Sequence, residues 1–291
     1  MQILLDDLSK EEAKTYGLVL LSSGIEYQSA KGLNGWELRV NDDASYASAV
    51  ELIQTYLHEN RSFEPSPKKQ NKEYSRTFSG LWGAVVILAI HVAVFSGHDA
   101  GSFAKVYGSS ARHILSGEWY RCATSLLLHA DYVHLVGNIA GITVFGTAVC
   151  SVMGWGVGWI MMLASGMLGN LINAYFYQTG HLSIGASTTV FGAVGLLSAY
   201  QFIKKIKLRG ERYQAFLPIA AGMALLAFLG AARQTDIMGH LFGFLAGLGL
   251  GMMYRFFIKK PLRWTYQAGA LLIVVAGLAG AWFYPIIRGT H

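Results

Sequence analysis

Residues 132–203 read YVHLVGNIAGITVFGTAVCSVMGWGVGWIMMLASGMLGNLINAYFYQTGHLSIGASTTVFGAVGLLSAYQFI, and none of these 72 positions is Asp, Glu, Lys or Arg. A membrane-spanning helix needs about 20 largely apolar residues, so this stretch has room for three spans. The whole chain of 291 residues is 53% hydrophobic and 14% charged, whereas a soluble domain carries about 25% charged residues. The sequence therefore predicts an all-α polytopic membrane protein and excludes an ordinary soluble globule.

Hydropathy predicts seven spans along the chain. Their approximate bounds are 78–96, 132–153, 155–177, 185–203, 215–232, 238–257 and 267–284. The segment between the first two spans is too polar to cross a bilayer and too rich in aromatic residues for a free linker. We expect it to lie against the protein or at the membrane interface.

Residues 1–66 differ from the rest of the chain in charge. They hold eleven acids and five bases, a net charge of −6, whereas the remainder carries +12. Helical apolar spacing in 9–24 and 44–60 encloses two strand-like segments at 25–30 and 35–40, with QILL at 2–5 as a further candidate strand. This order predicts a small α+β domain in residues 1–66. A basic linker at 67–77 follows it.

Basic residues are unevenly shared between the two sides of the predicted membrane topology. Thirteen lie in the segments on one side and five on the other, and basic loops favour the cytoplasm. We therefore expect the amino terminus and the domain of residues 1–66 to be cytoplasmic in a cell-membrane protein. Membrane topology explains this basic charge first, so nucleic acid is not an expected partner.

Four polar residues fall at one depth in this topology. His134 and Asn138 begin the second span, Ser187 begins the fourth and His240 begins the sixth, each ~3–10 Å below the outer boundary at about 1.5 Å rise per residue. Strongly polar groups inside a bilayer usually face a protein interior or a water-filled cavity. A lone serine in such a helix is most often a packing residue and a lone histidine a hydrogen-bond partner. Their common depth favours a site instead.

Glycines surround two of these residues. Gly239, Gly243 and Gly247 repeat every four residues around His240, and Gly185 lies just before Ser187. Small residues at this spacing let helix backbones approach closely. The fourth and sixth spans can thus bring Ser187 and His240 within hydrogen-bond reach.

Several motifs in the chain, taken in order, resemble those of the rhomboid intramembrane serine proteases. GEWYRCATSLLLHADYVHLVGN resembles the Trp-Arg motif and the His-His-Asn pattern of the family, and LASGMLGNL resembles its third-span signature. GASTTVFG resembles the nucleophile motif and GHLFGFLAG the catalytic-histidine motif. The resemblance covers residues 78–258, which it implies form a six-helix catalytic core. Residues 259–291 then add a loop and a seventh, carboxy-terminal span.

The resemblance also implies roles for individual residues. Ser187 would be the nucleophile and His240 its general base, while His134 and Asn138 would donate hydrogen bonds to the oxyanion. Trp119, Arg121, His129, Gly185 and Gly243 would be structural members of the motifs. No acid lies in the second to fourth spans, so we expect a dyad, with no metal and no cofactor.

One position departs from the family pattern. Thr188 directly follows Ser187, where the family usually has glycine. Its side chain could crowd the backbone that binds the oxyanion. The resemblance therefore supports the fold more directly than the activity.

These observations predict a serine endopeptidase that hydrolyses peptide bonds in or near the outer end of transmembrane segments. The alternative is a catalytically inactive rhomboid-like protein that binds transmembrane helices. A transporter or channel is disfavoured because the usual charged markers of ion pathways are absent from the second to fourth spans. The expected partners are transmembrane substrates and the lipid bilayer.

Two questions stay open at the level of sequence. Gln178, Thr179 and His181 precede the fourth span, where they would either line a water-filled cavity or cap helix ends. The domain of residues 1–66 would either be passive and solubilising, or would regulate the protein and bind a cytoplasmic partner.

Overall fold

The computed structural model describes residues 2–32, 35–60, 75–95, 100–207, 212–230, 235–258 and 262–289. The chain separates into two compact units, Met1–Asn71 and Lys72–His291. Most of the expected basic linker, residues 67–74, lies outside the described residues.

The first unit is a three-stranded antiparallel sheet with two helices. Its elements are β1 (Gln2–Leu8), α1 (Lys10–Ser22), β2 (Tyr27–Lys31), β3 (Trp36–Val40) and α2 (Asp43–Glu59), and the strand order is β1-β3-β2. Ser9 and Glu12 form a capping box at the start of α1, and Asp42 caps α2. Leu20 and Val40 are fully buried in the core between the helices and the sheet. The predicted small α+β domain is confirmed, and the QILL segment is part of a complete strand.

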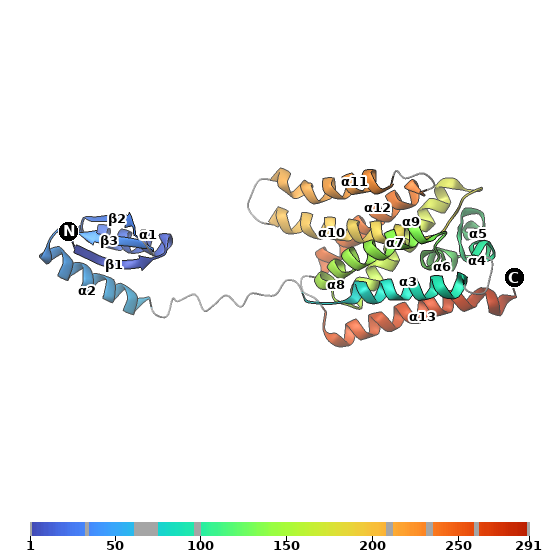
Figure 1. Ribbon diagram of the computed structural model, residues 1–291, viewed down its shortest axis with the longest axis horizontal. Coiled ribbons are helices and arrows are strands. Elements are labelled where there is room, and N and C mark those ends of the chain that lie inside the picture. The colour runs from blue at the N-terminus through green and yellow to red at the C-terminus, as the bar shows by residue number, and fades with distance from the viewer. Residues whose placement is uncertain are drawn as a thin grey trace. The chain divides into compact units, whose positions relative to one another are not determined.

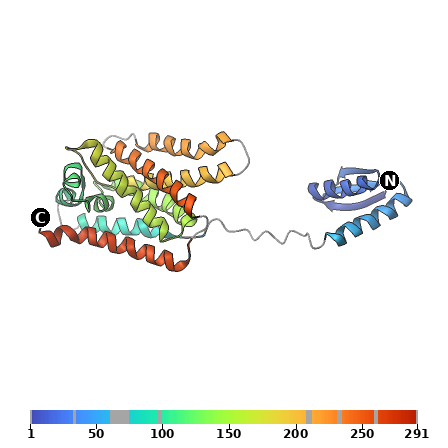
Figure 2. The ribbon, with the colours of Figure 1, turned by 180° about the vertical axis from the view of Figure 1, so that it is seen from behind.

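The second unit is a helix bundle (Figures 1 and 2). Its principal elements are α3 (Ser79–Phe95), α4 (Ala100–Tyr107), β4 (Ser109–Ser110), α5 (Ala111–Leu115), α6 (Arg121–Thr124), α7 (Tyr132–Gly141), α8 (Thr147–Met153), α9 (Val157–Tyr177), β5 (Leu182–Ser183), α10 (Ser187–Lys207), α11 (Leu217–Gly230), α12 (Ile237–Phe257) and α13 (Trp264–Arg288). A π-helical turn, Ile142–Gly146, joins α7 to α8. Figure 1 shows α4, α5 and α6 gathered at one end of the bundle, with α11 and α13 on opposite sides.

Four helical segments in the described residues are long and apolar enough to cross a membrane. They are Tyr132–Met153, Val157–Tyr177, Ile237–Phe257 and Trp264–Arg288. Two shorter apolar helices, Ser79–Val94 and Tyr213–Phe228, lie where the first and fifth spans are expected. The expected fourth span lies in α10, a 21-residue helix that begins with three hydroxyl residues and ends with lysines. The predicted all-α polytopic membrane fold is confirmed.

Helix α10 packs closely against α12 at the centre of the bundle. A Cβ atom added to Gly247 of α12 would collide with the backbone carbonyl of Gly192 in α10. The two backbones are therefore in direct contact, as the spacing of small residues in α12 predicts. This contact aligns the first turns of α10 and α12, which carry Ser187 and His240.

Helix α13 is held to the bundle by polar and aromatic contacts. The buried Gln267 side chain accepts hydrogen bonds from the backbone N–H groups of Gly156 and Val157, each 2.9 Å away, at the start of α9. Near its other end, the Trp282 ring stacks on Tyr107, with the ring centroids 4.5 Å apart. The aromatic segment between α3 and α7 thus packs against the protein.

Candidate active site

Ser187 and His240 lie on neighbouring helices and face one another. Ser187 is the first residue of α10, and His240 lies in the first turn of α12. The distance between Ser187 Oγ and His240 Nε2 is 2.8 Å. Ser187 is partly exposed, whereas His240 is buried, with a relative exposure of 5%. A hydroxyl and an imidazole at this distance can exchange a proton.

An aromatic ring also packs on His240. The ring of Phe191, one turn further along α10 than Ser187, packs on the imidazole with a centroid distance of 4.6 Å. The buried Nδ1 atom of His240 has no hydrogen-bond partner among the described residues. The described part of the chain thus places a serine–histidine pair here, without a carboxylate on the histidine.

His134 lies beside this pair. Gly185 has a φ angle of +138°, which a residue with a side chain rarely adopts. A Cβ atom built on Gly185 would lie 2.6 Å from His134 Nε2 and 3.5 Å from Ser187 Oγ. Glycine at this position therefore leaves the space in which the imidazole of His134 approaches the hydroxyl of Ser187.

Asn138 follows one turn after His134 on α7 and is buried. Its side-chain Nδ2 donates to the backbone carbonyl of His134 over 3.1 Å. Gly141, at the end of the same helix, closely approaches the Val190 side chain of α10. The polar face of α7 is thus held near the beginning of α10.

The Thr188 side chain packs against glycines of α9 and α12. Its methyl group lies 2.7 Å from the position of a Cβ atom added to Gly169 and 2.9 Å from one added to Gly243. Thr188 is 4% exposed. It therefore fills the junction of α9, α10 and α12, and Gly243 provides the room for it.

Arg121 links parts of the segment between α3 and α7 by hydrogen bonds. This buried side chain donates to Glu118 Oε2 over 2.6 Å and to the carbonyl oxygen of Lys105 over 2.7 Å. Burial disfavours the charged form of Glu118, but the hydrogen bond and positive charge of Arg121 outweigh this and place the pKa of Glu118 below its usual range. Arg121 thus joins α4 to α6 and lies in a structural network.

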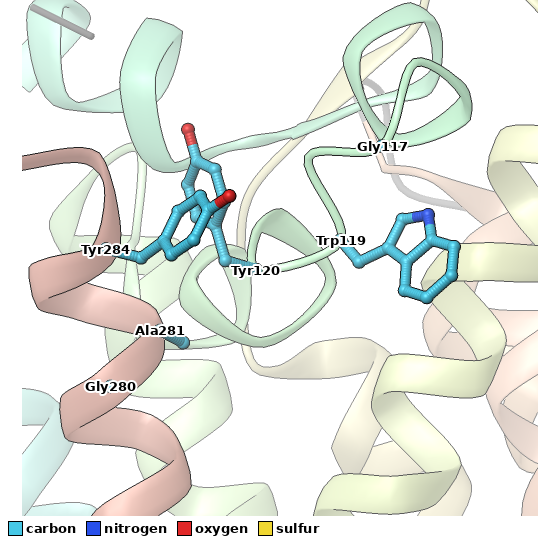
Figure 3. Close-up of a pocket in the computed structure, with 6 residues that line it drawn as sticks. All are labelled: Gly117, Trp119, Tyr120, Gly280, Ala281 and Tyr284. Carbon is cyan, nitrogen blue, oxygen red and sulfur yellow. The ribbon is translucent and has the colours of Figure 1, made fainter. Parts of the chain in front are cut away.

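Trp119 occupies a different place from Arg121. It is 70% exposed and lines a pocket of about 290 Å³ with Tyr120 and three residues of α13, Gly280, Ala281 and Tyr284 (Figure 3). Gly117 completes the lining. None of these residues belongs to the serine–histidine pair, so this pocket is separate from the candidate active site.

His129 is 3% exposed and lies between two other histidines. Its ring centroid is 5.4 Å from that of His134 and 6.3 Å from that of His91 in α3. His129 therefore packs against the ring of His134. Cys122 and Cys150 are buried and free.

Sequence reasoning missed some neighbours of the pair. Phe191 lies one helical turn beyond Ser187, and that spacing could have placed it on the same face. Asp236 caps α12 and binds His181 and Asn173, but no spacing in the sequence links these three residues. Gln178, Thr179 and His181 were expected either to line a cavity or to cap helix ends. Of these three, His181 contacts Asp236, the capping residue of α12.

The geometry thus defines a multi-pass membrane protein in which a buried histidine meets a serine between two closely packed helices. Residues 116–256 match the Rhomboid domain family. The chain therefore contains a rhomboid domain.

Curated relatives include both named proteases and an inactive protein. The chain is 26% identical over 140 residues to YdcA of Bacillus subtilis, a candidate rhomboid protease, covering 48% of this chain and 69% of that protein. It is 33% identical over 146 residues to rhomboid-like protease 3 of Toxoplasma gondii, covering 50% and 55%. It is 29% identical over 178 residues to the human inactive rhomboid protein 2, covering 58% and 21%. The chain thus spans about half of the Toxoplasma protein and about a fifth of the human one.

Proposed function

We propose that this protein is an intramembrane serine endopeptidase whose catalytic residues are Ser187 and His240. The observation that carries the proposal is the 2.8 Å contact between Ser187 Oγ and His240 Nε2. A serine hydroxyl is a weak nucleophile until an adjacent base removes its proton. The imidazole of His240 is placed to do so.

The proposed reaction has two stages. Ser187 Oγ attacks the carbonyl carbon of the peptide bond while its proton passes to His240 Nε2. His240 then gives that proton to the leaving amine, and an acyl-enzyme ester remains on Ser187. A water molecule, deprotonated by His240, hydrolyses this ester and restores both residues.

Charge on the tetrahedral oxyanion needs hydrogen-bond donors. The first N–H groups of a helix have no partner within the helix, and Ser187 begins α10. Together with this backbone N–H group, we assign the side chains of His134 and Asn138 as donors. The proximity of His134 to Ser187 across Gly185 supports the first assignment. Asn138 would exchange its bond to the His134 carbonyl for one to the oxyanion.

The substrates in this proposal are membrane proteins cleaved near the outer end of a span. The depth of Ser187, His134 and His240 at the starts of their helices supports this, if those ends face outward as the basic residues predict. The amino terminus and residues 1–66 would then be cytoplasmic.

Labelling of the purified full-length protein with a fluorophosphonate tests the proposal. We expect the wild type to be labelled, and Ser187→Ala and His240→Ala to remain unlabelled. Ser198→Ala is the matched control, because Ser198 is a buried serine of the same helix that donates to the Pro218 carbonyl over 2.9 Å. Equal labelling of wild type and Ser187→Ala would overturn the proposal.

The similarity to an inactive human rhomboid protein supports a second candidate function, binding of transmembrane helices without cleavage. That function predicts a folded, unlabelled wild type that still retains a single-span membrane protein in detergent. The same labelling experiment, with co-purification of such a protein, separates the two functions.

A further inference from the structure

Three polar side chains from separate parts of the chain meet at the beginning of α12. Asp236 Oδ2 accepts hydrogen bonds from Asn173 Nδ2 over 2.7 Å and from His181 Nε2 over 2.9 Å. The same two donor atoms are 3.1 Å apart. Asn173 belongs to α9, His181 to the loop before α10, and Asp236 to the cap of α12.

The other oxygen atom of Asp236 holds the first turn of α12. Oδ1 accepts from the backbone N–H of Gly239 over 2.9 Å, and the backbone carbonyl of Asp236 accepts from the N–H of His240 over 3.0 Å. This is the turn that carries the proposed general base. The position of Asp236 therefore determines where the backbone of His240 lies.

His181 is fixed in the loop that leads into Ser187. The backbone carbonyl of His181 accepts from Ala111 N–H over 3.0 Å, and β5, which follows it, pairs with β4. Further along, Gly185 N–H donates to the Ser125 carbonyl over 2.9 Å. The ring of Tyr177 stacks on the imidazole of His181, with the centroids 4.0 Å apart. The side chain of His181 thus has little freedom to leave Asp236.

The electrostatics of Asp236 agree with this arrangement. Burial disfavours its charged form, but the hydrogen bonds from His181 and the Gly239 N–H group outweigh burial and lower the pKa of Asp236 below its usual range. The titratable groups that face it are His181 from the loop and His240 one turn along its own helix. Asp236 therefore remains a carboxylate at neutral pH, and it needs its hydrogen-bond donors because an unpaired buried charge is costly.

We propose that Asp236, His181 and Asn173 form a positioning cluster that sets the distance between Ser187 and His240. The inference rests on the proposed function. Asp236 Oδ1 fixes the turn of α12 that carries His240, and Oδ2 ties that turn to α9 and to the loop that ends at Ser187. Among the described residues, the hydrogen bonds of the cluster reach the turn of His240 through the backbone of α12, so we infer that the cluster acts through the backbone. A misplacement of about 1 Å between reacting groups can cost ~10²-fold in rate.

The test compares Asp236→Asn, His181→Ala and His181→Gln with the wild type in the full-length protein. Two measurements are made: the rate of fluorophosphonate labelling of Ser187, and kcat and KM for a single-span substrate. We expect Asp236→Asn and His181→Ala to lower the labelling rate and kcat by about 10- to 100-fold, with KM changed less than threefold. Glutamine can donate to Oδ2 in place of histidine, so His181→Gln should recover much of the loss. Thr179→Ala, an exposed residue of the same loop, is the control.

A merely structural role predicts a different result. It would lower the unfolding temperature of Asp236→Asn and His181→Ala while the labelling rate per folded molecule stayed at the wild-type value, and this outcome would overturn the inference. The double variant supplies a second criterion. Residues that act as one unit are non-additive, so Asp236→Asn with His181→Ala should be labelled about as slowly as the slower single variant. Multiplied losses in the double variant would contradict a common cluster.

Failure of the inference can be told from failure of the proposed function. A wild type that is labelled at Ser187, with equal rates in all the cluster variants, overturns the inference alone. A folded wild type that is not labelled overturns the proposed function and this inference with it.

Discussion

At the scale of single residues, Ser187 and His240 have ordinary chemistry until the fold joins them. Each is compatible with simple packing when taken alone in a membrane helix. At 2.8 Å, neither group can complete the proposed proton transfer without the other. Their contributions to the rate should therefore behave as one unit.

Mutant kinetics provide the corresponding prediction. Ser187→Ala, His240→Ala and the double variant should all reduce cleavage of a membrane substrate to a similar floor, because members of one catalytic unit are non-additive. The measurement is kcat/KM for each variant in detergent or vesicles. A double variant far slower than either single variant would show that the two residues act independently.

Thr188 offers a second prediction at this scale. Its methyl group lies near Gly169 and Gly243, so Thr188→Gly should leave the labelling rate of Ser187 within about threefold of wild type. The lost packing and the greater freedom of glycine should lower the free energy of unfolding by about 1–2 kcal/mol. Thermal unfolding and labelling kinetics check the two parts. A large gain in labelling rate would show that threonine crowds the site after all.

Asp236 gives a pH dependence whose sign follows from its lowered pKa. A carboxyl with a lower pKa in the folded state stabilises the fold above its unfolded pKa of about 4, and this stabilisation is lost as the pH falls through the lower folded value. Wild type should therefore unfold at a higher temperature than Asp236→Asn at neutral pH. The difference should shrink below about pH 4. A difference that grows in acid would contradict the lowered pKa.

At the scale of elements, we expect the candidate site to depend on the backbone contact between α10 and α12. Gly247 touches the Gly192 carbonyl, whereas a Cβ atom on Gly249 of the same helix would meet nothing within 4 Å. These two glycines lie two residues apart in α12. They differ because the backbone of α10 lies against Gly247, whereas no neighbouring element of the described chain lies against a Cβ atom built on Gly249.

This contrast gives a matched pair of substitutions. Gly247→Ala should force α12 from α10, lower the free energy of unfolding by about 1–3 kcal/mol and slow the labelling of Ser187. Gly249→Ala should be neutral or stabilising, because alanine favours a helix by up to about 1 kcal/mol over glycine. Thermal unfolding of both variants is the measurement. Equal effects would mean that the α10–α12 contact does not position the site.

The sequence alone predicts the membrane spans and the approach of α10 to α12, but it does not predict the side-chain contacts around the candidate site. Charge-free apolar runs and glycines at a spacing of four residues are local patterns, so the spans and the close approach of α10 and α12 follow from them. Asn173, His181 and Asp236 lie in three segments, and only the packed bundle brings them together. The orientation of Thr188 depends on the rotation of α10 about its axis. No local pattern determines that rotation.

At the scale of the whole molecule, the distribution of basic residues predicts an orientation that labelling can test. A cysteine at Gly210 should resist a membrane-impermeant thiol reagent in intact cells, and one at Gln178 should react, after Cys122 and Cys150 are replaced. The reason is the bias of basic residues toward the cytoplasmic side. Reversed labelling would place the amino-terminal domain outside.

Under the proposed function, a substrate reaches a site near the outer membrane surface. A peptide bond inside an intact helix is shielded by its own backbone hydrogen bonds, so cleavage requires local unwinding near the outer end of the span. Glycine or proline lowers the cost of that unwinding by about 1–3 kcal/mol per residue. Replacing such a residue with leucine near the cut should therefore slow cleavage roughly tenfold or more, measured as the initial rate at equal substrate density in vesicles. The matched control places the same substitution at the opposite end of the span, where no change is expected. Equal rates for both substrates would mean that an extramembrane contact, rather than helix instability, selects the substrate.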